Sequence, residues 1–225
     1  MAVGRLHGEP VRFASGPNRT ALIELYTSEG CNSCPPAERW MATLRGEPGL
    51  WRDFVPVAWH VDYWNRLGWP DRFSTREFTQ REYAYAAAWA SSSVYTPCFV
   101  RDGVEWTGSH SLAPSGTAAG QLSVRYDGTT LHAEFSPAGA PPGGTFEIHA
   151  AILGGSIISK VRAGENSGET LHHEFIALKL AHGALGHDLA LPVPKVTGVP
   201  RHALAVWVTR SGQLTPLQAT GGWLD

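Results

Sequence analysis

The sequence has few cysteines, and their number limits the class of protein. Three Cys occur among 225 residues, whereas small secreted domains that are held together by disulfides carry several pairs in a much shorter chain. An odd number also leaves at least one thiol outside any intrachain pair. This pattern favours cysteines that react or bind a ligand over cysteines that only form structural disulfides.

Long hydrophobic runs and an excess of basic charge are also lacking. No apolar stretch approaches the roughly 20 residues that span a bilayer, and the first 18 residues carry charges, Pro and Gly where a signal peptide would be apolar. We therefore expect no membrane insertion, with a cytoplasmic location for the chain as it stands, or a periplasmic or secreted one if a leader was removed. The 18 Lys and Arg against 20 Asp and Glu give a net charge of −2, which disfavours nucleic acid as a partner.

The first half of the sequence alternates between β-prone and helical segments. Apolar, β-prone runs occupy residues 20–27 and 54–64. Two prolines open a helical segment over 35–49, and a Ser with a Glu three residues later opens another over 74–92. Residues 97–106 contain an Asp-Gly pair between two β-prone runs, which predicts a hairpin. The predicted order is therefore strand, helix, strand, helix and hairpin.

From about residue 121 the sequence changes to short alternating or apolar runs separated by Gly, Pro and Asn. Runs at this spacing predict an antiparallel β-sandwich. We expect an N-terminal arm over residues 1–18, an α/β domain over 19–112, a linker over 113–120 and a β-sandwich-like domain over 121–225. Seven of the nine Trp precede residue 107, which favours separate cores for the two domains.

The stretch GCNSC places Cys31 and Cys34 at the predicted start of the first helix. With Cys31 at the N-cap, unpaired backbone N–H groups and the helix dipole would stabilise its thiolate, and thiols in such positions have pKa values of roughly 3.5–7.5. We expect Cys31 to attack a substrate and Cys34 to resolve the mixed disulfide. A metal clip and inert packing are the alternative interpretations of the same spacing.

A proline adds to the redox interpretation. Pro97 follows the second predicted helix and precedes a β-prone run, a position that a central strand would normally reject. A cis peptide bond between Thr96 and Pro97 would explain it, because cis bonds are almost confined to proline and usually mark a tight, fixed geometry. An ordinary turn or edge-strand proline is the alternative.

These features together resemble the thioredoxin-like superfamily over residues 20–107, with GCNSC at its dithiol loop and TP at its cis-proline. The resemblance implies an α/β thioredoxin-like domain with a central mixed sheet flanked by helices, and a backbone at Thr96 that pairs with a bound substrate chain. The motifs ELYTSEGCNSCPPAE, HVDYWNRLGWPDRFS, SVYTP and RAGENSGETLHHEF resemble the bacterial family of domain of unknown function 1223. That resemblance implies a thioredoxin-like domain followed by a β-rich one, without a settled substrate.

Other side chains are candidates for roles around the dithiol. Glu24 lies in the first predicted strand, where a buried carboxylate of raised pKa could take the proton from Cys34; a surface glutamate is the alternative. Trp64 and Trp69 are candidates for an aromatic wall beside a substrate chain, with ordinary packing as the alternative. Tyr95 is a further candidate for substrate binding.

A metal site is a separate hypothesis. Cys98 follows the predicted cis-proline and could join Cys31 and Cys34 in a soft-metal site for copper or zinc, with His60 as a further ligand. The alternative for Cys98 is a buried, inert thiol. His60 and Asp62 would share one face of a strand and could converge on one ligand.

The sequence therefore predicts an enzyme, a thiol-disulfide oxidoreductase that acts on protein or low-molecular-weight thiols or disulfides and needs no cofactor. A copper- or zinc-binding thiolate protein and a redox-inert adaptor are the alternatives. The direction of electron flow does not follow from CNSC, because nothing in Asn32 or Ser33 relates to a reduction potential.

Overall fold

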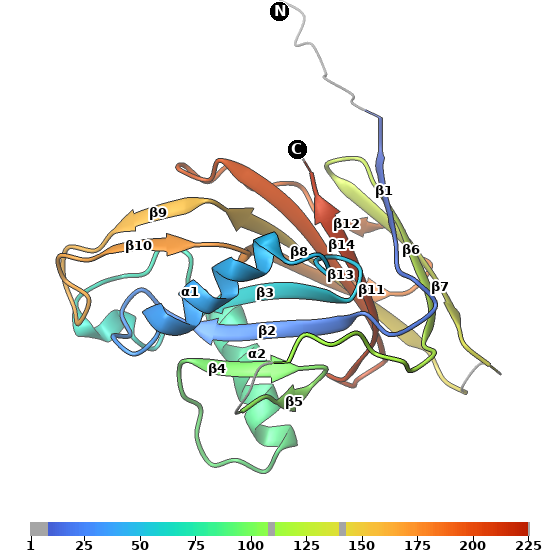
Figure 1. The fold of residues 1–225 in the computed structure, drawn as a ribbon, viewed down its shortest axis with the longest axis horizontal. Helices are drawn as coiled ribbons and strands as arrows, with labels where there is room; N and C mark the ends of the chain where they lie inside the picture. The colour runs from blue at the N-terminus through green and yellow to red at the C-terminus, as the bar shows by residue number, and fades with distance from the viewer. Residues whose placement is uncertain (1–8, 108–110, 140–142, 225) are drawn as a thin grey trace, which may run out of the picture.

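An eight-stranded sheet extends through both halves of the chain (Figure 1). The structure is a computed structural model, and it describes residues 9–107, 111–139 and 143–224. In spatial order the strands of this sheet are β14 (Pro216–Trp223), β13 (Arg201–Arg210), β8 (Phe146–Gly155), β11 (Ile176–Ala184), β3 (Phe54–His60), β2 (Ala21–Thr27), β4 (Cys98–Arg101) and β5 (Val104–Glu105). The first half of the chain supplies β2 to β5, and the second half supplies the others.

The two halves join where β11 runs parallel to β3. Ile176 lies opposite Ala58, whose N–H donates to the carbonyl oxygen of Phe175 at 2.8 Å. Every residue of β3 is buried, and an uncovered edge on such a strand would present unpaired backbone groups. Because β11 covers that edge, adjacent strands of the sheet come from distant parts of the sequence.

A second, four-stranded sheet packs against the β8 and β13 side of the first. Its strands, in spatial order, are β1 (Val11–Ala14), β6 (Gly120–Tyr126), β7 (Thr130–Pro137) and β12 (Leu189–Ala190). Leu122 and Leu131 from this sheet share a buried core with Ile148, Ile152 and Val206 from the first. A two-stranded hairpin, β9 (Ile157–Lys160) and β10 (Thr170–His173), continues from the end of β8 (Figure 1).

Two α-helices cover opposite faces of the large sheet around β2 and β3 (Figure 1). α1 (Pro35–Thr43) begins with two prolines, as predicted, and continues into the 3₁₀ helix η1 (Leu44–Gly46). A second 3₁₀ helix, η2 (Asn65–Leu67), precedes α2 (Arg76–Ala88). The cap of α2 is Thr75 rather than the predicted Ser, and its hydroxyl accepts a bond from the N–H of Phe78. None of the helices in the described residues is both long and apolar enough to cross a membrane.

The predicted fold class is wrong. β-strands account for 42% of the structure and helices for 13%, whereas the sequence predicted an α/β thioredoxin-like domain followed by a β-sandwich-like domain. The physical reason is the shared sheet. The strands of the first half form one side of a larger β structure and do not make a separate sheet flanked by helices.

The hydrophobic cores of the two halves are also joined. Trp59 from β3 contacts Trp207 from β13, with ring centroids 6.2 Å apart, and both are fully buried. Trp51 contacts Trp223 at 5.7 Å. The uneven distribution of Trp along the sequence therefore does not mark separate cores. The predicted arm contains β1, which pairs with β6, and the boundaries of the two domains stay predictions.

We expect the chain to unfold in one cooperative transition, because the large sheet and the Trp core are shared between the halves. Chemical denaturation, followed in parallel by tryptophan fluorescence and far-ultraviolet circular dichroism, shows whether tertiary and secondary structure are lost in one transition. Coincident midpoints are the expected result. Two separated transitions, or a stable fragment over residues 19–112, would show that the halves fold independently.

Candidate functional site

Cys31 and Cys34 form a disulfide in the turn that leads into α1. Cys34 is the N-cap residue of the helix, and its N–H donates to the carbonyl oxygen of Cys31 at 3.2 Å. The prediction of Cys31 at the N-cap is wrong, because Pro35 takes the first helical position. Both cysteines have an exposed fraction of 0%, whereas Asn32 and Ser33 between them are exposed.

The Thr96–Pro97 peptide bond is cis, as the sequence predicted, and it lies beside the disulfide. The carbonyl oxygen of Thr96 is 3.8 Å from Cys31 Sγ and accepts a bond from Ser33 Oγ at 3.4 Å. Ser33 Oγ is in turn 3.3 Å from Cys31 Sγ. The structure therefore brings the dithiol turn and Thr96 together. Pairing of the Thr96 backbone with a substrate chain stays a prediction.

The loop between β9 and β10 braces the dithiol turn from the second half of the chain. The side-chain amide of Asn166 donates to the carbonyl oxygens of Glu29 and Cys31, both at 2.9 Å. The carboxylate of Glu165 accepts a bond from the N–H of Asn32 at 3.2 Å. Neither loop residue was predicted from the sequence, although both belong to the RAGENSGETLHHEF motif. Their place depends on contacts between the two halves of the chain.

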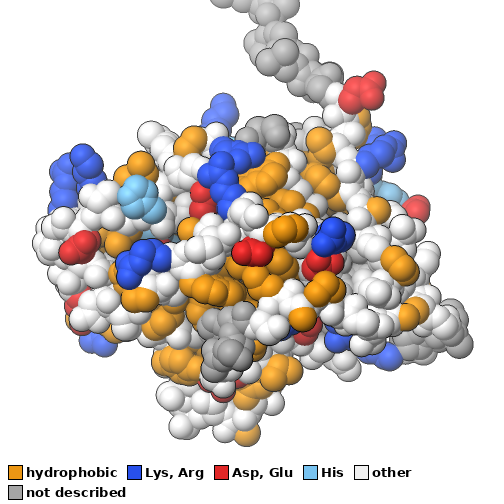
Figure 2. All heavy atoms as spheres, in the orientation of Figure 1, with side chains coloured by type: hydrophobic (Ala, Val, Ile, Leu, Met, Phe, Trp, Pro, Cys, Tyr) orange, Lys and Arg blue, Asp and Glu red, His pale blue; other side chains and the backbone are white. Residues whose placement is uncertain are grey.

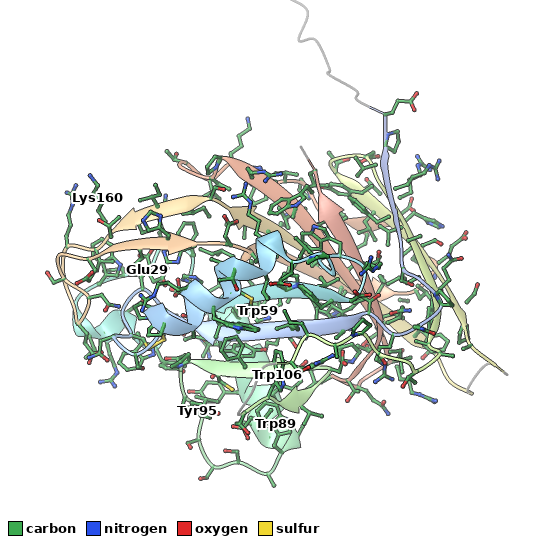
Figure 3. The ribbon with its side chains drawn as sticks, in the orientation of Figure 1. Glu29, Trp59, Trp89, Tyr95, Trp106 and Lys160 are labelled. Carbon is green, nitrogen blue, oxygen red and sulfur yellow. A yellow bond between two sulfur atoms is a disulfide. The ribbon has the colours of Figure 1, made fainter. Side chains whose placement is uncertain are left out.

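Two of the three predicted aromatic residues flank the dithiol turn. The indole N–H of Trp64 donates to the Thr96 hydroxyl at 2.8 Å, and that of Trp69 donates to the Glu29 carboxylate at 2.7 Å. Tyr95 is 46% exposed and donates to Glu105 instead. Figure 3 shows Glu29 near the β9–β10 hairpin and Tyr95 beyond β4. A substrate-binding role for the three aromatic residues stays a prediction.

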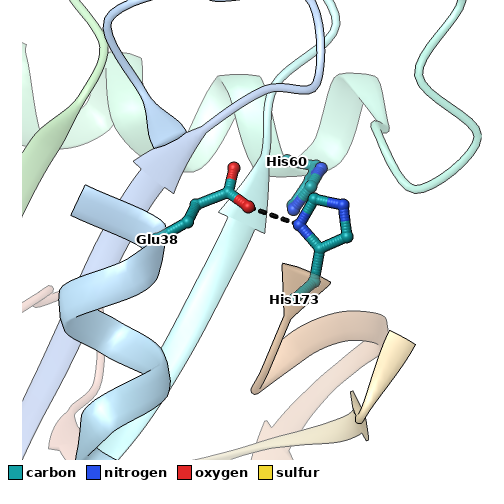
Figure 4. Close-up of side chains that lie close together, drawn as sticks. All are labelled: Glu38, His60 and His173. Atoms are coloured by element: carbon teal, nitrogen blue, oxygen red, sulfur yellow. Dashed lines mark hydrogen bonds and ion pairs between the residues drawn. The ribbon is translucent and has the colours of Figure 1, made fainter. Parts of the chain in front are cut away.

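A buried cluster of carboxylates and histidines lies next to the dithiol turn. It consists of Glu29, Glu38, His60, Asp71 and His173, with exposed fractions between 0% and 6%. His173 Nδ1 pairs with Glu38 Oε2, and His173 Nε2 lies 3.4 Å from Glu29 Oε1. His60 Nδ1 pairs with Asp71 Oδ2 at 2.6 Å. Figure 4 shows Glu38, His60 and His173 converging from α1, β3 and β10.

Hydrogen bonds tie this histidine–carboxylate cluster to the dithiol turn. Glu38 stands four residues after Cys34 in α1, and its N–H donates to the carbonyl oxygen of Cys34 at 3.1 Å. The hydroxyl of Thr27, the last residue of β2, donates to Glu38 Oε1 at 2.6 Å. The N–H of Glu29 donates to Asp71 Oδ2 at 2.9 Å. The cluster and the disulfide therefore form one connected structure.

Opposite charges stabilise the cluster. Burial would lower the pKa of His173, but Glu38 and Glu29 raise it to about 10. Burial would also lower the pKa of His60, yet Asp71 holds it above its ordinary value. Burial raises the pKa of a carboxyl group, but His173 brings the pKa of Glu38 below its usual range, and His60 does the same for Asp71. The cluster thus favours charged imidazoles paired with ionised carboxylates.

His60 was a predicted site residue, but its partners in the cluster were not predicted from the sequence. Asp62 does not join it: Asp62 Oδ1 accepts a bond from the Thr79 hydroxyl of α2 at 2.6 Å, because β3 ends at His60 and the alternation of faces ends with it. Asp71 and His173 stand in the motifs HVDYWNRLGWPDRFS and RAGENSGETLHHEF. Those motifs carry the family resemblance, but only the fold shows that the side chains of Asp71 and His173 lie in the same cluster as His60.

Glu24 lies on the α2 face of the sheet. Its carboxylate accepts bonds from three buried groups: Trp59 Nε1 at 2.9 Å, Arg81 Nε at 2.7 Å and Tyr85 Oη at 2.6 Å. Successive side chains of a strand point to opposite faces, and Thr27 of the same strand contacts α1. Glu24 therefore points away from the helix that begins at Cys34, and it is not placed to take a proton from that thiol.

Cys98 also lies on the α2 side. It stands opposite Tyr26 in the β2–β4 pair, and Tyr26 contacts Tyr85 of α2 with ring centroids 6.3 Å apart. Burial raises the pKa of the Cys98 thiol to about 12. Its side chain lines a cavity of about 110 Å³ with Glu82 and Tyr95. Cys98 is therefore not placed to complete a thiolate metal site with the dithiol.

The buried ion pair of Glu24 with Arg81 gives a stability prediction. The two side chains are 0% and 8% exposed, so Arg81→Met leaves an unpaired buried carboxylate and should cost about 3–5 kcal/mol of unfolding free energy. The double variant Glu24→Gln with Arg81→Met should recover most of that loss. Urea denaturation measures both changes.

Arg45→Met provides the matched control, because Arg45 pairs with Glu174 but is 42% exposed. It should cost no more than about 1 kcal/mol. Equal losses for Arg81→Met and Arg45→Met would contradict the assigned burial.

Comparison with known proteins gives the family of the chain and two solved structures with a similar fold. Residues 22–209 match the family described as protein of unknown function (DUF1223). A crystal structure of a protein from Agrobacterium tumefaciens has a TM-score of 0.59 at 20% identity, over 91% of this chain and 94% of that chain.

HBP35 of Porphyromonas gingivalis also has a TM-score of 0.59, at 13% identity, over 94% of this chain and 77% of that chain. At these identities the two solved structures show a shared fold and nothing further. No curated protein matches the sequence. Since the family match spans most of the chain, from β2 to β13, the protein belongs to the DUF1223 family.

Proposed function

We propose that the Cys31–Cys34 pair carries out thiol–disulfide exchange with protein or low-molecular-weight thiols or disulfides. The observation that carries this proposal is a disulfide that closes a turn with a sequence separation of only 3, at the start of a helix. The chain entropy that a crosslink removes from the unfolded state is smallest for such short loops. The disulfide is therefore expected to add little to the stability of the fold, which favours a chemical role for the two cysteines.

The exchange begins when the thiolate of a reduced substrate attacks Cys31 Sγ. A bond forms between the substrate sulfur and Cys31 while the Cys31–Cys34 bond breaks, and Cys34 leaves as a thiolate that takes up a proton. A second substrate thiol then attacks the substrate sulfur of the mixed disulfide and releases Cys31. The substrate loses two electrons and two protons, and the chain gains them. The reverse sequence reduces a substrate disulfide.

The position of each sulfur supports this assignment of roles. Cys34 stands at the N-cap of α1, where the helix dipole stabilises negative charge, and a thiol of lower pKa is the better leaving group. Cys31 lies beside the Thr96 carbonyl and precedes the two exposed residues Asn32 and Ser33. We therefore assign Cys31 as the sulfur that a partner attacks and Cys34 as the leaving sulfur.

Access to the disulfide requires movement, because both cysteines are fully buried. Asn166 holds the carbonyl oxygen of Cys31, so we expect this contact with the bracing loop to open before a partner sulfur reaches Cys31. On the face that carries α1, basic, acidic and hydrophobic side chains are interspersed (Figure 2). A surface with mixed charges discriminates weakly between substrates of different charge, which is compatible with a broad class of thiol or disulfide substrates.

A closed disulfide also bears on where the protein acts. Disulfides persist in oxidising compartments such as the periplasm and are reduced in most cytosols. We therefore favour the periplasmic or secreted alternative for the site of action.

The reduction potential of the Cys31–Cys34 pair tests the proposal. The chain is equilibrated in glutathione buffers of graded ratio, quenched with acid and alkylated, and the reduced fraction is read by mass spectrometry. We expect a midpoint above about −300 mV, because structural disulfides lie below that value. In Cys34→Ser, Cys31 should carry one glutathione as a mixed disulfide.

Cys98→Ser is the matched control and should leave the midpoint unchanged, since Cys98 lies on the other face of the sheet. A pair that stays oxidised across the whole series, together with an unmodified Cys31 in Cys34→Ser, would assign a purely structural disulfide.

A further inference from the structure

Glu38, His60 and His173 each bring one ligand atom to within 4.8 Å of the others. They come from α1, β3 and β10, and Figure 4 shows their polar ends facing one another. All three are buried, at 6%, 0% and 2% exposed. Two imidazole nitrogens and one carboxylate oxygen form a donor set that binds Zn²⁺ and related divalent ions.

His60 is oriented as a metal-binding histidine is. Its Nδ1 is held by Asp71 Oδ2 at 2.6 Å, and Asp71 accepts bonds from the N–H groups of Glu29 and Phe73, both at 2.9 Å. A carboxylate behind one ring nitrogen fixes the ring and leaves the other nitrogen for a metal. That other atom, His60 Nε2, is buried and has no hydrogen-bond partner among the described residues. Buried polar atoms are almost always satisfied, so this one points to a ligand.

The charge of the cluster is compatible with a divalent ion. Glu29, Glu38 and Asp71 contribute three carboxylates, and only His60 and His173 offset them within the cluster. A divalent ion would bring two positive charges to this group of three carboxylates, and buried charges are normally paired or coordinate a metal.

We propose that Glu38, His60 and His173 bind a divalent first-row transition ion, for which Zn²⁺ is the probe, and that Asp71 positions His60. This site differs from the thiolate site that the sequence suggested, because Cys31 is already bonded in the disulfide. It does not depend on the proposed exchange chemistry.

Zinc content after refolding tests the proposal. The full chain, with its disulfide kept oxidised, is unfolded with chelator, freed of chelator and refolded with Zn²⁺, because burial of all three ligands restricts entry into the folded chain. After gel filtration, mass spectrometry of the metal should give one Zn²⁺ per chain. Asp71→Asn should weaken binding about 10- to 100-fold.

The neighbours His172 and His173 give a matched pair of variants, since His172 is exposed and His173 is buried. His173→Gln should lose the zinc, and His172→Gln should keep it. X-ray absorption at the zinc edge of the wild-type chain tests the ligands even if a variant fails to fold. It should show nitrogen and oxygen ligands without sulfur. Folded wild-type chain without zinc, sulfur among the ligands, or zinc retained by folded His173→Gln would overturn the proposal.

Discussion

The parallel pairing of β3 with β11 is the constraint on which the rest of the structure depends. It continues one sheet from the first half of the chain into the second, and the β9–β10 hairpin reaches the start of α1 as a result. Without it, the dithiol turn would have neither Asn166 nor His173 beside it. The first half supplies the disulfide and the cis-proline, and the second half supplies the brace and one of the histidines. The site is therefore a product of both halves.

Buried charged side chains lie on both faces of the large sheet. On the α2 face, Glu24 accepts hydrogen bonds from three donors, including the guanidinium of Arg81. We expect this ion pair to stabilise the fold. On the α1 face, the five titratable side chains next to the dithiol turn are linked by hydrogen bonds, but His60 Nε2 has no partner among the described residues. An unsatisfied buried polar atom costs about 1–3 kcal/mol. This unpartnered nitrogen beside the disulfide therefore favours ligand binding on the α1 face.

Local features of the fold and site could be predicted from the sequence, and long-range ones could not. The turn of Cys31 and Cys34, the helix that opens with two prolines and the cis bond at Pro97 each follow from a few neighbouring residues. The fold class was wrong because the partner of β3 lies far along the chain, and no local pattern reports which strand covers an edge. The place of Glu24 was missed for a subtler reason. A shift of one residue along a strand moves a side chain to the other face, and Glu24 stands on the face away from α1.

The rate at which dithiothreitol reduces the disulfide in Asn166→Ala measures how far the second half of the chain restricts access to Cys31. Asn166 anchors the carbonyl oxygens of Glu29 and Cys31, and the disulfide is fully buried, so reduction requires the brace to open. Loss of that anchor should speed reduction about tenfold or more, as expected if opening becomes roughly 1.4 kcal/mol easier. Ser167→Ala, at the exposed neighbouring position, should leave the rate unchanged. Equal rates for the wild type and a folded Asn166→Ala variant would show that the contacts of Asn166 do not restrict access to the disulfide.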